Sequence, residues 1–246
     1  MNFDREKYLV VATARNIDSL DKIPADMRLT LDVCQRESIK TAVDSVLKEA
    51  GRIDVLINNA GFSARAVAEE IDITQMRKML DVNVLGMLQM MQEVLPVMMS
   101  QRGGRILNIG SISGRMTGIV NGGYCGAKYA VEALSEAARY ETVGMGIEVA
   151  LIEPGAMETE FFDTLWKNSR SAMLNGNSPY QELYEHDIAY RQKQNKSSVD
   201  TCALKIIQIL EKNKLKVRYT VGVPLLFRIF VHLPDSMKEL GIKVFN

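Results

Sequence analysis

The sequence of 246 residues has few of the side chains that build metal centres and disulfide frameworks. It contains two histidines, His186 and His232, and three widely spaced cysteines, Cys34, Cys125 and Cys202. An odd number of scattered cysteines without a Cys-x-x-Cys pair argues against disulfides and against a zinc site. We therefore expect no metal centre, no catalytic triad built on histidine, and a reducing compartment.

An excess of charge of either sign is also absent. Lysine plus arginine number 30, as do aspartate plus glutamate, so the formal net charge is zero. A neutral chain has no electrostatic drive toward nucleic acid or an anionic membrane, and we expect no nucleic-acid partner. Because the N-terminus lacks the basic start and apolar core of a signal peptide, the expected location is the cytoplasm.

Long uninterrupted apolar runs are missing as well. The nearest approach, residues 221–234 (VGVPLLFRIFVHLP), contains Arg228 and His232. It is also shorter than the roughly 20 residues that a spanning helix needs. We expect a buried or substrate-facing helix here, and the alternative is a peripheral contact with a membrane surface.

Short apolar segments that favour strands alternate with amphipathic segments that favour helices. This order predicts a parallel sheet with right-handed crossovers and helices on both faces, a three-layer, doubly wound α/β fold. Gly51 is expected to end the first helix and Thr74 to cap the second. The expected strands cover residues 8–13, 27–33, 53–58, 105–111, 147–155 and 216–222, and the expected helices 37–51, 74–101, 123–144 and 198–214.

No repeat or low-complexity linker divides the chain, so we expect a single domain over residues 1–246. Residues 160–197 form a less regular segment within it, which we interpret as a lid or substrate-binding insertion. A helix–strand–helix extension is expected to follow at about residues 198–246.

Two residues of the segment GYCGAKYAVEAL indicate acid–base chemistry. Tyr124 and Lys128 are four residues apart, so a helix places them on one face. A tyrosine with an ordinary pKa near about 10 is a weak acid–base catalyst at neutral pH, and a neighbouring ammonium group lowers that pKa. Such a pair can exchange a proton with an alcohol or a carbonyl. By itself the motif is weak, because Tyr-x-x-x-Lys is usually only one face of a helix.

Other small or polar residues gather at the carboxyl ends of the expected strands, where parallel sheets bind ligands. Ser111 follows one strand, and Asn83 lies inside an expected helix although asparagine is a mediocre helix former. The small residues of Asn58–Gly61 and of Pro154–Gly155 permit close approach of a ligand. The combination is improbable by chance and predicts an active site at this edge of the sheet.

In their order and spacing these motifs resemble those of the short-chain dehydrogenase/reductase family. The resemblance rests on NNAG at 58–61, Asn83, Ser111, the Tyr124 and Lys128 pair, and PGAMET at 154–159, and it spans roughly residues 8–162. The chain is most similar to hydroxysteroid and retinol dehydrogenase-like members. The resemblance implies a Rossmann-like fold and an oxidoreductase that interconverts an alcohol and a ketone or aldehyde. It also implies a small apolar substrate of the steroid, retinoid or long-chain carbonyl type.

The resemblance also implies a role for each matching residue. Tyr124 would exchange the proton with the substrate oxygen, and Lys128 would lower the Tyr124 pKa and bind the nicotinamide ribose. Ser111 would hold the substrate oxygen, and Asn83 would anchor a water in a proton relay. The further residues implied to line the cofactor are Asp32 and Val33 at the adenine, Asn59, Ala60 and Gly61 at the adenosine ribose, and Pro154, Gly155, Met157 and Thr159 at the nicotinamide.

Arg15 bears on the choice of cofactor. It ends the first expected strand, and no acidic residue follows before Asp18. At this position an acid hydrogen-bonds the ribose 2′-hydroxyl of NAD, whereas an arginine favours the 2′-phosphate of NADP. We expect NADP(H), with NAD(H) as the alternative.

The main departure from the family pattern is at the front of the sequence. The family's first strand, its glycine-rich turn (TGxxxGxG) and the helix that follows have no counterpart ahead of residue 8. Without that central strand, residues 8–13 and 54–58 should face each other across a gap of about two strand spacings (~10 Å). The pyrophosphate would also lose the backbone amides and helix N-terminus that favour its charge.

Two functional hypotheses therefore stay open. The first is an NADP(H)-dependent oxidoreductase, and the second is a catalytically silent variant that binds cofactor poorly and acts through dimerisation. The family implies a homodimer or tetramer that pairs the helices at 74–101 and 123–144. Methionines at 87, 90, 91, 98 and 99 give the first of these helices an adaptable apolar surface.

Overall fold

The computed structural model describes residues 7–159, 165, 168–169, 176–234 and 236–238. Strands and helices alternate along these residues as expected. The strands are β1 (Val11–Ala14), β2 (Met27–Thr30), β3 (Val55–Asn58), β4 (Gly104–Ile109), β5 (Ile147–Pro154) and β6 (Arg218–Val221). The helices are α1 (Arg36–Ala50), α2 (Ile73–Leu80), α3 (Met87–Gln101), α4 (Gly122–Glu141), α6 (Gln181–Lys193), α7 (Val199–Leu210) and α8 (Leu225–Phe230).

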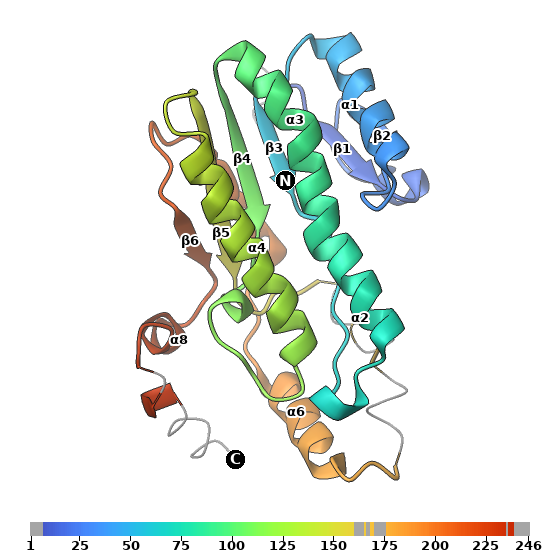
Figure 1. The fold of residues 1–246 in the computed structure, drawn as a ribbon, viewed down its shortest axis with the longest axis vertical. Coiled ribbons are helices and arrows are strands. Elements are labelled where there is room, and N and C mark those ends of the chain that lie inside the picture. The colour runs from blue at the N-terminus through green and yellow to red at the C-terminus, as the bar shows by residue number, and fades with distance from the viewer. Residues whose placement is uncertain (1–6, 160–164, 166–167, 170–175, 235, 239–246) are drawn as a thin grey trace.

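The strands form two separate sheets. β1 pairs with β2, and a second sheet has the order β3-β4-β5-β6, with every pair parallel. The interruption expected between β1 and β3 is therefore present in the described part of the chain (Figure 1). The strands on either side of this interruption, β1 and β3, have apolar side chains that are only half-buried, at Val11, Ala12, Val55 and Ile57.

Helices cover both faces of the four-stranded sheet, which confirms the three-layer prediction. Alternate side chains of β5 enter different cores, because successive residues of a strand point to opposite faces. Val149 and Leu151 pack in the cluster that includes residues of α1, α3 and α4. Ala150 and Ile152 pack in the cluster that includes residues of α7.

A continuous helix runs from Ile73 to Gln101 and passes through a π-helical stretch at Asp81–Gly86. Its end agrees with the prediction, but Thr74 is not its cap. The Asp72 carboxylate caps it by accepting from the N–H groups of Thr74 and Gln75 at 2.7 and 3.4 Å. Asp72 lies two residues before Thr74 and accepts from the free N–H groups of the first turn. The helix therefore begins earlier than predicted.

By length and composition this helix could also cross a membrane. Its apolar side is instead used within the protein, since the side chains of Met87, Met91, Val94 and Met98 are buried in the core shared with the sheet. A core helix of a globular domain meets the same criterion of length and hydropathy. The arrangement in Figure 1, with α3 lying along the sheet, is that of a core helix.

The remaining elements follow the expected order, with one correction. α1 ends at Gly51, whose left-handed φ of 72° suits glycine, as predicted. The expected insertion contains α6, and the rest of it is partly outside the described residues. α8 was expected to be buried or to face the substrate. Burial is wrong, since none of its residues is buried and Leu225 and Leu226 are 67% exposed, whereas a role facing the substrate stays a prediction.

Candidate active site

The three residues closest to the expected acid–base chemistry lie together at the carboxyl end of β4. Ser111 follows β4 and caps a short 3-10 turn, and its hydroxyl accepts from the N–H of Ser113 at 3.1 Å. Tyr124 and Lys128 lie in the first two turns of α4. The Ser111 hydroxyl also hydrogen-bonds the Tyr124 phenol. The structure therefore joins Ser111, Tyr124 and Lys128 as predicted.

Lys128 is a buried cation in this site. Its Nζ donates to the carbonyl oxygen of Ile109 at 2.7 Å and lies 5.8 Å from the centroid of the Tyr124 ring. Burial lowers the pKa of Lys128 to about 8, and the carboxylate of Glu132 opposes part of that change. A buried ammonium whose pKa lies this close to neutral can gain or release a proton under ordinary conditions.

The Tyr124 pKa differs from the expectation. Burial raises it to about 12, and the hydrogen bond from Ser111 only partly opposes this effect. The Lys128 ammonium donates to the Ile109 carbonyl, and burial of Tyr124 outweighs any lowering of its pKa by that charge. In this arrangement Tyr124 keeps its proton at neutral pH and can donate it.

Asn83 is buried in the π-helical stretch between α2 and α3. Its side-chain amide accepts from the N–H of Phe62 at 2.9 Å and donates to the Phe62 carbonyl at 2.8 Å. A Cβ atom on Gly61 would lie 3.1 Å from the Asn83 Oδ1, so the glycine lets the chain pass close to this amide. Asn83 therefore fixes the loop after β3. Its implied role in holding a water stays a prediction.

Val120 holds the entrance to the catalytic helix in a strained conformation. Its φ of 58° lies in the left-handed region, which is unusual for a β-branched residue and costs roughly 1–3 kcal/mol. The Val120 side chain is buried against Val67 and Tyr184, and this packing stabilises the strained turn. Tyr184 belongs to α6, so the insertion supports the start of α4.

The residues expected at the adenosine ribose and the nicotinamide follow the ends of β3 and β5. Asn59, Ala60 and Gly61 are exposed there, and Pro154, Gly155 and Met157 are half-buried. A Cβ atom on Gly155 would lie 2.5 Å from the carbonyl oxygen of Gly222, so only glycine fits at that position. Thr159, also exposed, donates its N–H to the Met157 carbonyl at 3.1 Å.

The residues expected at the adenine and its ribose phosphate belong to the other sheet. Arg15 is exposed after β1, and Asp32 and Val33 follow β2. The carboxylate of Asp32 accepts from the N–H of Cys34 at 3.0 Å. The Val33 side chain lies against Gly86, where a Cβ atom would come within 2.6 Å of it. Val33 thus packs on the start of α3, and the structure does not test its contact with an adenine.

The expected site residues suit the nicotinamide half of a nicotinamide dinucleotide better than its pyrophosphate. Ser111, Tyr124 and Lys128 offer the hydroxyl, phenol and ammonium groups that suit a carbonyl and a ribose. Among the described residues, no glycine-rich turn at a helix N-terminus stands beside β1 to hold a pyrophosphate. The same residues contain no group of three or more histidine, cysteine and acidic side chains that could hold a metal ion.

A buried ion pair that sequence reasoning missed joins α6 to the loop after β3. Arg65 donates from Nη1 to the Asp187 Oδ1 at 2.7 Å, and both side chains are almost fully buried. Tyr184 supports the same contact, since its hydroxyl donates to Glu70 at 2.7 Å and accepts from the N–H of Val67 at 3.2 Å. No local pattern indicated this pair, because 122 residues separate its members.

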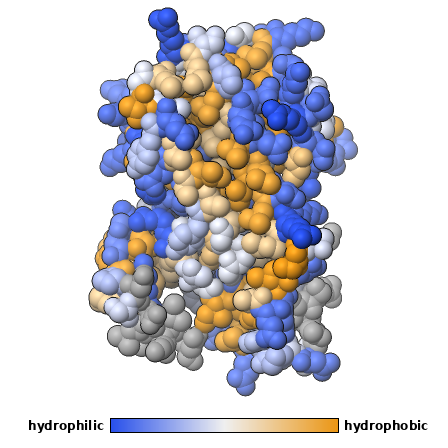
Figure 2. Space-filling view, in the orientation of Figure 1, coloured by the Kyte–Doolittle hydropathy of each residue, from blue (hydrophilic) through white to orange (hydrophobic). Residues whose placement is uncertain are grey.

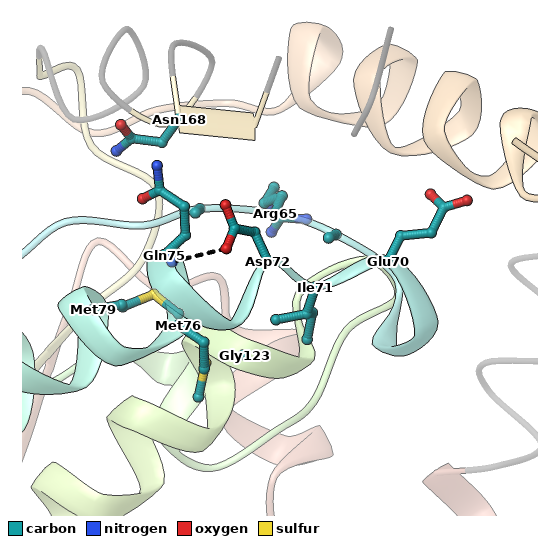
Figure 3. A pocket seen from close by; sticks show the side chains of 11 residues that line it. Arg65, Glu70, Ile71, Asp72, Gln75, Met76, Met79, Gly123 and Asn168 are labelled. Carbon is teal, nitrogen blue, oxygen red and sulfur yellow. Dashed lines mark hydrogen bonds between the residues drawn. The ribbon is translucent and has the colours of Figure 1, made fainter. Parts of the chain in front are cut away.

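A pocket of about 300 Å³ opens beside this ion pair and next to the start of α4 (Figure 3). Figure 3 shows the amides of Gln75 and Asn168 facing each other across it. Apolar and polar side chains both line the cavity, so its chemistry is mixed. The lining residues are Ala64, Arg65, Ala66, Glu70, Ile71, Asp72, Gln75, Met76, Met79, Gly123 and Asn168.

A second missed group lies on the other side of Lys128. Glu132, one helical turn after Lys128, accepts from the Arg218 Nε at 2.8 Å, and Glu153 of β5 lies 3.4 Å from the same nitrogen. Two features of the sequence could have indicated this group. Glu153 is an acidic residue inside the apolar strand IEVALIEP, and Glu132 follows Lys128 by four residues.

Known proteins resemble the chain over most of its length. Residues 1–170 match the short chain dehydrogenase family. An uncharacterized oxidoreductase of Schizosaccharomyces pombe is 38% identical over 147 residues, which cover 60% of this chain and 62% of that protein. The chain thus matches less than two thirds of that relative's length.

Two other relatives align over longer stretches. The 3-ketodihydrosphingosine reductase of Bacteroides thetaiotaomicron is 31% identical over 97% of this chain and 88% of its own length. The NADP-dependent 3-hydroxy acid dehydrogenase of Schizosaccharomyces pombe is 33% identical over 74% of each chain.

The fold is also similar to that of solved structures. The crystal structure of a short-chain dehydrogenase from Streptomyces avermitilis superposes with a TM-score of 0.75 at 25% identity, covering 96% of this chain and 87% of that one. The order of strands, the placement of Ser111, Tyr124 and Lys128, and these similarities lead to one conclusion. The chain belongs to the short-chain dehydrogenase family.

Proposed function

We propose that the protein is an NADP(H)-dependent oxidoreductase that interconverts an alcohol and a ketone or aldehyde. The observation that carries this proposal is the contact of Ser111 with Tyr124, one helical turn from the buried ammonium of Lys128. Together these groups provide a proton donor, a hydrogen-bond donor for a substrate oxygen, and a positive charge within one small volume.

The chemistry follows from the protonation states of these side chains. In the direction of reduction, a bound nicotinamide would supply the hydride for the carbonyl carbon. Ser111 and Tyr124 donate hydrogen bonds to the carbonyl oxygen, where negative charge develops. Tyr124 then transfers its proton to that oxygen, and the positive charge of Lys128 stabilises the phenolate that remains. In the direction of oxidation, the phenolate takes the proton back.

Two observations support NADP(H) as the cofactor. Arg15 is exposed at the end of β1, where its guanidinium can meet a 2′-phosphate, and one relative is named as NADP-dependent. Fluorescence titration with NADPH and NADH tests the preference. An Arg15→Ser variant should lose NADPH affinity at least about tenfold and leave NADH affinity unchanged, since only NADPH carries the extra phosphate.

The pocket beside α4 supports a substrate with an apolar body and a polar end. Ile71, Met76 and Met79 offer apolar surface, and Gln75 and Asn168 offer amide groups. Steroid, retinoid and long-chain carbonyl compounds with a second polar group have this chemistry. Apolar residues near and after the insertion also favour an apolar substrate, with ordinary core packing as the alternative. Leu165 is buried, Phe227 is half-buried, Leu225 and Leu226 are exposed, and Phe161, Phe162, Trp166 and Met173 lie outside the described residues.

The decisive experiment is turnover of a panel of such carbonyl compounds with NADPH. Tyr124→Phe should abolish turnover and preserve nucleotide affinity, because it removes only the transferable proton. Tyr129→Phe is the matched control, since Tyr129 lies on the same helix but is exposed to solvent. Turnover by the Tyr124 variant at the parent rate would contradict the proposal.

The interruption between β1 and β3 supports a second candidate, a protein that is silent in catalysis and acts through self-association. Titration with NADPH separates the two. A dissociation constant in the micromolar range would eliminate this second candidate, whereas no change in melting temperature at millimolar NADPH would favour it. The titration and the turnover assay are both repeated on a longer chain, in which the first strand, glycine-rich turn and helix of a family member precede this sequence. Absence of turnover by that longer chain would contradict the enzyme proposal.

A further inference from the structure

Glu153 is a fully buried carboxyl group that has no hydrogen-bond partner in the part of the chain that the structure describes. It lies near the end of β5, its exposed fraction is 0%, and neither of its side-chain oxygens has a partner among the described residues. The nearest cationic groups lie farther from its carboxylate oxygens: Arg218 Nε is 3.4 Å and Arg115 Nη1 is 3.9 Å away. An ionised carboxylate is costly in such a place, because neither water nor a donor compensates for its lost hydration.

Glu132 takes the hydrogen bond that Glu153 lacks. Arg218 donates from Nε to the Glu132 Oε2 at 2.8 Å and from Nη2 to the Glu136 Oε2 at 3.1 Å. The other oxygen of Glu132, Oε1, is buried and has no partner among the described residues. One guanidinium therefore serves two carboxylates of α4 and leaves the third, on β5, without a bond.

Glu132 lies directly against the loop that carries Ser111. A Cβ atom on Gly110 would lie 3.0 Å from the Glu132 Oε1, and one on Gly114 would lie 2.9 Å from both the Glu132 Cγ and the Lys128 carbonyl. The two glycines flank Ser111 and its turn, so the loop can lie against Glu132 only because they carry no side chain. The charge on Glu132 also acts on Lys128.

We propose that Glu132, Glu153 and Arg218 form a buried positioning network behind Lys128, in which Glu153 holds a proton and Glu132 holds the negative charge. The division follows from the contacts, since Arg218 donates to Glu132 and not to Glu153. Glu132 then keeps a counter-charge close to the Lys128 ammonium. That consequence for catalysis rests on the proposed function, whereas the protonation of Glu153 does not.

The charged groups that face Glu153 come from three surrounding elements. They are Glu132 on α4, Arg218 on β6, and Arg115 after the turn that carries Ser111. Burial, and after it the charge of Glu132, disfavour the charged form of Glu153, and the two arginines favour it; the balance raises the pKa of Glu153 to about 7. Glu153 should therefore lose its proton near neutral pH, well above the range of an exposed glutamate.

Infrared spectra of the whole chain in D₂O, without cofactor or substrate, test the network. Protonated carboxyl groups give a carbonyl stretch separate from the carboxylate bands. In the parent this band should weaken as the pH rises from about 6 to about 8, and Glu153→Gln should remove that change. Glu136→Gln is the matched control, because Glu136 binds the same arginine at the surface; it should behave as the parent does.

A second variant tests the division of charge. In Glu132→Gln, Arg218 is free to donate to Glu153, so the band should disappear at a pH at least about one unit lower than in the parent. Equal spectra for the parent and Glu153→Gln would overturn the proposal. If Glu153→Gln does not fold, an unshifted band in Glu132→Gln overturns it instead. Because no turnover is measured, failure here is distinct from failure of the proposed function.

Discussion

The side-chain amide of Asn83 binds both backbone polar groups of Phe62, at 2.9 and 2.8 Å. This pair ties the π-helical stretch before α3 to the loop that leaves β3. The loop carries Asn59, Ala60 and Gly61, which are expected to line the adenosine ribose. A single buried amide thus sets the distance between a core helix and the loop that is expected to bind the cofactor.

Replacement of Asn83 by leucine should therefore destabilise the protein. The variant leaves the N–H and carbonyl of Phe62 without partners, which costs about 1–3 kcal/mol for each buried group. Urea unfolding measures the loss of free energy, and Asn177→Leu, at an exposed position, is the control. Equal stability of the two variants would show that the Phe62 groups find other partners.

Lys128 should give the protein an unusual dependence on pH. Burial lowers its pKa from 10.5 to about 8 in the folded chain, so the unfolded chain binds the proton more tightly. Stability should rise as the pH increases from about 8 to about 10, by a total on the order of 2–3 kcal/mol. At higher pH the raised pKa of Tyr124 has the opposite effect, because the unfolded tyrosine ionises first.

Thermal unfolding between about pH 7.5 and 10 measures this slope. Lys128→Met, which keeps the length of the side chain without its charge, should remove the slope. Lys205→Met on the exposed side of α7 should retain it. An unchanged slope in Lys128→Met would assign the titration to another group.

Asp187 should be essential for the position of α6. Asp187→Asn leaves the Arg65 guanidinium buried without its counter-ion, and breaking a buried ion pair in this way costs about 3–5 kcal/mol. Denaturant unfolding and proteolysis within α6 report the loss, with the exposed Asp200→Asn as control. The double variant Arg65→Met/Asp187→Leu should recover part of the stability, and failure to recover would show that the charges are not what destabilises the single variant.

The exposed apolar surface of α3 and α4 should mediate self-association. Figure 2 shows apolar side chains gathered along the middle of the face on which these helices lie. Leu85, in the π-helical stretch before α3, and Tyr129, on α4, are exposed apolar residues of these helices, with 46% and 44% of their surfaces exposed. Leu85→Glu/Tyr129→Glu should shift the protein to monomers in sedimentation velocity experiments. The control is Leu204→Glu, on α7 at the opposite face, which should not change the size of the protein. An unchanged size in the double variant would place the interface elsewhere.

The sequence was most informative where chemistry restricts residue type. Ser111, Tyr124 and Lys128 were predictable because their spacing joins a strand end to a helix face, and Gly51 because a left-handed residue favours glycine. The interruption of the sheet was also predictable, since the resemblance implies a central strand between residues 8–13 and 54–58 that has no counterpart ahead of residue 8. Their described edges face a gap in the structure.

Interactions between distant residues and the effects of burial were not predictable. The raised pKa of Tyr124 follows from its burial, and the bond of Lys128 to the Ile109 carbonyl is visible only once β4 and α4 are placed together. The Arg65–Asp187 pair joins segments that share no local pattern. α8 has the composition of a buried helix, but the sheet ends before it and leaves Leu225 and Leu226 in solvent.

The separation of β1 and β2 from the larger sheet has a consequence for cooperativity. No backbone ladder joins the two sheets in the described residues, so side-chain packing connects them, through Ile39 and Val43 of α1 and through Leu29 of β2 and Leu31 after it. Amide hydrogen exchange should therefore find two units that open at different free energies. The amides of β1 and β2 should exchange through a partial opening, whereas those of β4 and β5 should wait for global unfolding.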